Sequence, residues 1–83
     1  MKQSAIKKIN EHLEKARKKH PEFAPGGPLQ VVSLATEELG EFAKEINEYD
    51  SFQFTLKGAN AMERATDEAL DLIAVLIRFI ERD

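Results

Sequence analysis

The residues of this chain best suited to chemistry are acidic and fall in two short patterns, Glu37-Glu38-x-x-Glu41 and Glu68-x-x-Asp71. Residues three or four apart share one face of a helix, so each pattern projects its carboxylates in a common direction. If the two helices pack side by side, at least four carboxylates converge. Carboxylates that close repel one another unless a cation lies among them, and oxygen ligands favour Mg²⁺ or a similarly hard ion. The spacing therefore predicts a divalent-metal site, and metal ions bound in this way usually contact phosphates.

Length and composition predict one small domain spanning residues 1–83. A chain of this length has a thin stability margin, so we expect it to have partners. The absence of cysteine excludes disulfides and thiolate chemistry and is typical of a reducing cytoplasm. The N-terminal residues do not resemble a signal peptide, and the longest apolar run, Leu72 to Ile77, is too short to span a bilayer. We expect a soluble, cytoplasmic protein with no membrane partner.

Charge is distributed unevenly along the chain. Residues 1–20 contain seven Lys or Arg against two Glu, whereas residues 21–83 contain five against thirteen Asp or Glu. A basic helix is one form of nucleic-acid-binding surface. Here, however, the pairs Glu11/Lys15 and Glu14/Lys18 have the spacing of a solvated helix face. We therefore expect no nucleic-acid partner, and we expect the first helix to lend positive charge to an anionic ligand.

Hydrophobic periodicity predicts three long helices, over about residues 4–19, 28–48 and 61–82, that form an antiparallel helical bundle. Pro21 ends the first helix, because the residue before a proline disfavours helical geometry. Pro28 suits the first position of the second helix, where its missing N–H costs nothing. The apolar stripe of the first helix consists of Ile6, Ile9, Leu13 and Ala16.

Apolar residues at alternating spacings of three and four define a seam on each of the other two helices. The seam of the second helix consists of Val32, Ala35, Leu39, Phe42, Ile46 and Tyr49. The seam of the third helix consists of Met62, Ala65, Ala69, Leu72, Leu76 and Phe79. From Ala69 onward the third helix is apolar almost all round, and such a helix is buried on every side. We therefore expect oligomerisation to a homodimer or homotetramer.

The segment between these two helices, residues 50–59, is predicted to be a structured loop. Phe52, Phe54 and Leu56 alternate as in a strand, but a single strand has nothing to pair with. Asn60-x-x-Glu63 resembles a capping box and is predicted to begin the third helix.

Basic residues flank the acidic pair of the third helix, since Arg64, Glu68, Asp71 and Arg78 fall on one line. A polyphosphate could use this arrangement, with a metal ion in the middle and guanidinium groups at the ends. Alternatively, Arg64/Glu68 is an ordinary helix pair and Arg78 a surface residue, and spacing does not decide between these interpretations. For the acids the alternative is a solvated face. Their proximity to apolar seams on two helices favours the metal site.

Other chemistries lack the residues they need. The serines have no histidine near them in sequence that would suggest a triad. His12 and His20 are too few for a zinc cluster. His12 is predicted to lie on the solvated side of the first helix and to be inert.

The acidic motifs resemble a known family. Glu37-Glu38-Leu39-Gly40-Glu41 followed by Glu68-Ala69-Leu70-Asp71 is similar to the EExxE…ExxD signature of the MazG-like all-α nucleoside triphosphate pyrophosphohydrolases. The resemblance covers residues 28–80. It implies an oligomeric helical bundle and a reaction that cleaves a (d)NTP between the α and β phosphates. The products are the nucleoside monophosphate and pyrophosphate, and the role is nucleotide-pool housekeeping.

The resemblance also implies roles for particular residues. Mg²⁺, with Mn²⁺ as a substitute, would be bound by Glu38, Glu41, Glu68 and Asp71. The catalytic residues would be Glu37, Glu38 and Glu41, with Glu37 as an auxiliary ligand or as the group that orients water. Candidates for binding the phosphate tail of the substrate are Lys44, Lys57, Arg64 and Arg78.

The chain departs from the family in three respects. It is short, it has no tryptophan to stack on a base, and the linker between its two motifs has no obvious extra helix. Phe23, Tyr49, Phe52 or Phe54 would have to replace it. Two alternatives stay open: the related phosphoribosyl-ATP pyrophosphatases, and a non-catalytic helical oligomerisation module with a solvated acidic face. Dependence of stability on Mg²⁺ separates this module from the enzyme.

Overall fold

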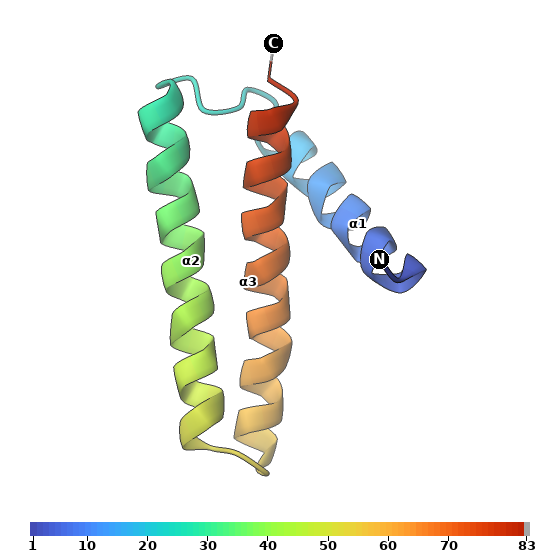
Figure 1. Ribbon diagram of the computed structural model, residues 1–83, viewed down its shortest axis with the longest axis vertical. Helices are drawn as coiled ribbons and strands as arrows, with labels where there is room; N and C mark the ends of the chain where they lie inside the picture. The colour runs from blue at the N-terminus through green and yellow to red at the C-terminus, as the bar shows by residue number, and fades with distance from the viewer. Residues whose placement is uncertain (83) are drawn as a thin grey trace.

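The computed structural model describes residues 1–82, and these fold into three α-helices with no strand among them. The helices are α1 (Gln3–Lys19), α2 (Pro28–Ser51) and α3 (Leu56–Ile80). The all-α class predicted from periodicity is confirmed. The chain turns after α2, and α3 returns beside it, whereas α1 leans away from this pair (Figure 1). No helix in the described part of the chain is both long and apolar enough to cross a membrane.

α1 packs against α3 and, within residues 1–82, makes no such contact with α2. Leu13 of its apolar stripe is buried, as predicted. The C-terminal half of α1 is fastened to the end of α3, because Arg17 pairs with Glu81 and Arg78 donates a hydrogen bond to the carbonyl oxygen of Ala16. This one-sided packing leaves a space between α1 and α2.

Small residues let α2 and α3 approach closely at the end away from α1. Ala61 and Ala65 are fully buried there. A Cβ on Gly58 would lie 2.2 Å from the carbonyl oxygen of Phe52, so the close contact at this point requires glycine. Pro28 is the first residue of α2, as predicted.

The predicted seams are wrong in part. Val32 and Leu39 are 61% and 54% exposed, whereas Val31, next to Val32, is buried. On α3, the predicted Ala65 is buried, whereas the predicted Met62 and Leu76 are exposed. The other buried residues of α3 are Gly58, Ala61, Leu70 and Ala74. The physical reason is that small side chains allow closer packing than large ones, so the pair of helices turns its small residues inward.

The connection between α2 and α3 is also shorter than predicted. α2 continues to Ser51 and α3 begins at Leu56, so most of residues 50–59 are helical. The predicted cap at Asn60 is wrong. Thr55 caps α3 instead, because its hydroxyl oxygen accepts a hydrogen bond from the backbone N–H of Gly58 at 3.1 Å.

Candidate metal centre

Three carboxylates from the two acidic motifs meet in the middle of the molecule. Glu38 of α2 and Glu68 and Asp71 of α3 each offer an oxygen, and these oxygens lie within 4.8 Å of one another. Glu68 and Asp71 are three residues apart, which places both on the face of α3 toward α2. Such a set of oxygen donors fits a hard divalent ion such as Mg²⁺ or Mn²⁺.

Glu38 is partly buried in this cluster, whose carboxylates repel one another, and its pKa is raised as a result. Burial raises the pKa of Glu38 from 4.5 to about 7, helped by a hydrogen bond to Glu68. The negative charges of Asp71, Glu68 and Glu37 contribute to the same rise in this pKa. Near neutral pH, a proton and a cation therefore compete for the carboxylate of Glu38.

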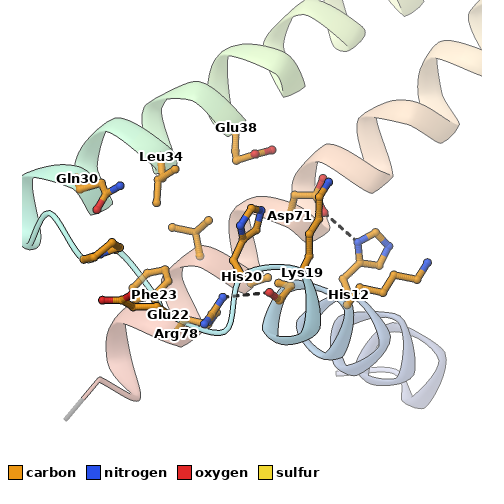
Figure 2. Close-up of a pocket in the computed structure, with 16 residues that line it drawn as sticks. His12, Lys19, His20, Glu22, Phe23, Gln30, Leu34, Glu38, Asp71 and Arg78 are labelled. Atoms are coloured by element: carbon orange, nitrogen blue, oxygen red, sulfur yellow. Dashed lines mark hydrogen bonds and ion pairs between the residues drawn. The ribbon is translucent and has the colours of Figure 1, made fainter.

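His12 belongs to this site, and the prediction that it lies on the solvated side of α1 is wrong. Its side chain is 20% exposed, and its Nδ1 lies 3.1 Å from Oδ1 of Asp71 (Figure 2). Its Nε2 lies 3.7 Å from Asp67. A histidine that donates to one carboxylate oxygen fixes the orientation of that carboxylate and leaves the other oxygen for a ligand.

A cavity of about 660 Å³ opens beside the cluster, in the space between α1 and α2. Glu38 and Asp71 lie on its edge, and the loop of residues 20–27 closes one end. The apolar part of its lining comes chiefly from Phe23, Pro25, Leu34, Ala74 and Val75. Acidic groups and apolar surface thus adjoin in one concave site, as is common in sites for small molecules.

The opposite wall of the cavity is basic. Lys15 and Lys19 of α1 line it together with His20, which follows the helix. Lys19 and His20 both reach into the space that Glu38 and Asp71 face (Figure 2). Lys15 and Lys19 place positive charge of α1 beside the cavity, and the expected contact with an anionic ligand stays a prediction.

Arg78 is the one predicted phosphate-binding residue that lines the described cavity. Its guanidinium group lies 4.9 Å from the ring centre of Phe23. It donates hydrogen bonds to the carbonyl oxygens of Ala16 at 3.2 Å and Pro21 at 3.4 Å. Arg78 therefore fastens the end of α1 and the following loop into a wall of the cavity.

The other three predicted phosphate ligands lie outside the cavity lining. Arg64 pairs with Glu45 and, at 2.7 Å, with Glu48. The hydrogen bond to Glu45 raises the pKa of Arg64. Lys57 lies 3.6 Å from Glu48. These contacts compensate the buried charge of Glu45 and hold α2 to α3. Lys44 is exposed on α2.

Of the acidic residues predicted to act with Glu38, two do not belong to the cluster of described carboxylates. Glu37 and Glu41 are exposed on α2, outside the set of oxygens within 4.8 Å. Glu41 lies three residues from Glu38, on an adjoining part of the helix surface. Comparison of the chain with models of protein families, with curated proteins and with solved structures finds no match.

Proposed function

We propose that this chain is a Mg²⁺-dependent nucleoside triphosphate pyrophosphohydrolase of the MazG-like family. It would cleave (d)NTPs between the α and β phosphates, in cytoplasmic nucleotide-pool housekeeping. The observation that carries the proposal is the meeting of both acidic motifs, as Glu38, Glu68 and Asp71, at the edge of a cavity with a basic opposite wall. The resemblance of the EExxE…ExxD pattern to that family supports the choice of reaction.

In the proposed reaction, water adds to the α-phosphorus, the bond from that phosphorus to the bridging oxygen breaks, and pyrophosphate leaves. Glu38, Glu68 and Asp71 would hold the metal ion, and His12 orients Asp71. When bound, Mg²⁺ would offset the negative charge that develops on the phosphate oxygens. A carboxylate on α2, Glu37 or Glu41, orients the attacking water and accepts its proton. No covalent intermediate with the protein is required.

The apolar lining of the cavity is the proposed site of the base. Phe23 is the only one of the four candidate stacking residues that lines it within the described chain. Phe52 and Phe54 belong to the turn between α2 and α3, at the end of α2 opposite to the one that lines the cavity. A base stacked beside Phe23 would place the phosphates toward the carboxylates.

We further propose that the active form is an antiparallel bundle completed by a second copy, as a homodimer or homotetramer. Large apolar side chains stay exposed on both long helices, among them Val32, Leu39, Leu76 and Ile80. A second copy would remove this surface from water, at about 25 cal/mol per Å² of apolar area. Light scattering during size-exclusion chromatography tests this part, and a monomer at micromolar concentration would contradict it.

The enzymatic proposal is tested by pyrophosphate release from a panel of canonical and modified (d)NTPs, with Mg²⁺ and with chelator. We expect metal-dependent release from the wild-type protein and from Glu63→Gln, a charge-matched control on an exposed residue of α3. We expect at least a hundredfold loss in Glu38→Gln, on the scale of a removed group that stabilises the transition state. Equal turnover by Glu38→Gln and the control would refute the assigned site.

A further inference from the structure

We propose that Lys19 and His20, at the C-terminal end of α1, form a subsite for the terminal phosphates of the ligand. The subsite faces Glu38 and Asp71 across the cavity. This inference deepens the proposed function and rests on it, because it identifies the oligophosphate part of the ligand as the part that α1 binds.

The charges around the cavity support a polyanionic ligand. Three carboxylates line it, those of Glu22, Glu38 and Asp71, and three cationic side chains line it, those of Lys15, Lys19 and Arg78. A divalent ion bound by Glu38, Glu68 and Asp71 would leave these groups and the lining together one charge positive. One end of an oligophosphate could then contact the metal ion. Its other end could accept charge-assisted hydrogen bonds from the lysine ammonium groups.

Lys19 is the cationic side chain best placed for this contact. It makes no ion pair with any carboxylate among residues 1–82, and it extends from α1 toward the space beside Asp71 (Figure 2). His20 points into the same space. The donors of Arg78, by contrast, are engaged by the carbonyl oxygens of Ala16 and Pro21.

Arg78 serves this subsite by positioning it. The C-terminal end of a helix carries partial negative charge, which disfavours an anion nearby. The guanidinium group of Arg78 bonds to a carbonyl oxygen of the last turn of α1 and supplies a full positive charge beside it. It also holds the loop that keeps Lys19 and His20 at the cavity.

The chain offers a matched control in Lys18. Lys18 and Lys19 both lie in the last turn of α1, so each interacts similarly with the helix dipole, and each change to Gln removes one positive charge. Lys18 does not line the described cavity, whereas Lys19 does. A difference between the two variants therefore reports a local contact and not the overall charge of α1.

The test is calorimetric titration of inorganic pyrophosphate into the wild-type chain, Lys19→Gln and Lys18→Gln, with Mg²⁺ and with chelator. We expect Lys19→Gln to weaken Mg²⁺-dependent binding about tenfold, the loss of one exposed charge-assisted hydrogen bond. We expect Lys18→Gln to change it less than about twofold, within the effect of one exposed charge. His20→Ala should weaken binding in the same direction as Lys19→Gln.

Equal weakening in the two lysine variants, no weakening in either, or no binding by the Mg²⁺-loaded wild-type chain would overturn the subsite. Its failure is distinguishable from failure of the enzyme proposal. If (d)NTPs are hydrolysed but pyrophosphate binding does not depend on Lys19, the subsite fails and the reaction stands. If pyrophosphate binding depends on Lys19 but no nucleotide is hydrolysed, the reaction fails and the subsite stands.

Discussion

Replacing Glu38 by glutamine should change stability in opposite directions without and with Mg²⁺. In the metal-free protein its carboxylate lies within 4.8 Å of those of Glu68 and Asp71. Two unit charges at that distance repel by about 1 kcal/mol in water and by about 3.5 kcal/mol at an effective dielectric constant of 20. Because these side chains are partly exposed, we take the lower figure. Glutamine has the same shape and no charge. At pH 8 without metal, Glu38→Gln should therefore be more stable by about 1 kcal/mol, which raises Tm by about 4–8 °C.

With Mg²⁺ the order should reverse. A ligand that binds only the folded protein stabilises it by about 2.7 kcal/mol at a hundred times its dissociation constant. The wild-type chain gains this increment, whereas Glu38→Gln loses a ligand and gains much less. The wild-type chain should therefore have the lower Tm of the two in chelator and the higher Tm in saturating Mg²⁺.

The pH dependence has a definite sign. The pKa of Glu38 is about 7 in the folded protein, above its ordinary 4.5, so the folded state binds this proton more tightly than the unfolded state. The stability that this proton contributes is present below about pH 4.5 and is lost as pH rises through about 7. Conversely, Mg²⁺ affinity should rise between pH 6 and pH 8, because the metal requires the deprotonated carboxylate. Glu38→Gln should lack both trends.

The assay is thermal unfolding by circular dichroism at pH 6 and pH 8, with chelator and with Mg²⁺. Glu63→Gln is the control, since it removes an equal charge from an exposed position of α3. If Glu38→Gln is less stable than the wild-type chain in chelator at pH 8, or if Mg²⁺ stabilises both equally, the carboxylates do not form a cation site.

Three further predictions concern the residues around the site and the helix packing. His12→Ala should lower the Mn²⁺ affinity measured by calorimetry about tenfold, because it releases Asp71. His12→Asn keeps a hydrogen-bond donor and should retain most of the affinity. Equal losses in both variants would argue against an orienting hydrogen bond. In urea titrations Gly58→Ala should lose about 1–3 kcal/mol, because its Cβ would meet a carbonyl oxygen, whereas Gly40→Ala, with nothing within 4 Å, should gain about 1 kcal/mol. The same sign for both would contradict the packing described. Arg64→Ala should lower Tm by leaving the buried Glu45 unpaired, and the double variant with Glu45→Ala should recover part of the loss. A double variant no more stable than Arg64→Ala would show that the pairing is unimportant.

The convergence of the two acidic motifs could be predicted from the sequence, for a physical reason. Spacings of three and four fix which residues share a helix face, and the apolar residues beside them require those faces to pack. These two facts bring Glu38 toward Glu68 and Asp71, as the structure shows. The same reasoning does not determine how far each helix turns about its axis.

That rotation explains the errors in the predicted packing. The spacing of large apolar residues placed Val32 and Leu39 in the seam, but the close approach of α2 to α3 depends on small residues, of which Ala65 was in the predicted seam and Ala61 was not. The pairing of Arg64 with Glu45 depends on the same rotation, and the spacing of Arg64 left open whether it binds a phosphate.

His12 could have been found by a closer examination of α1. It lies three residues after Ile9 and four before Ala16, so it shares the face of the helix that carries the apolar stripe. What the sequence could not give is the partner, because Asp71 is 59 residues away and the contact depends on how α1 leans against α3. The cavity beside it depends equally on α1 packing against α3 and not against α2.

The start of α3 shows a competition between two local signals. Asn60 and Thr55 are both good capping residues, and the sequence pattern Asn60-x-x-Glu63 favoured the first. Gly58 decides for Thr55, since only glycine tolerates the contact with the carbonyl oxygen of Phe52 that the tight turn creates. That requirement arises from the packing of α2 on α3 and has no signature within the segment itself.

The central claim is tested most directly by identifying the products formed from a (d)NTP in the presence of Mg²⁺ by ³¹P NMR. The proposed function predicts nucleoside monophosphate and pyrophosphate in equal amounts, formed by the wild-type chain and not by Glu38→Gln. Nucleoside diphosphate with inorganic phosphate, or no turnover by folded protein supplied with Mg²⁺, would contradict it.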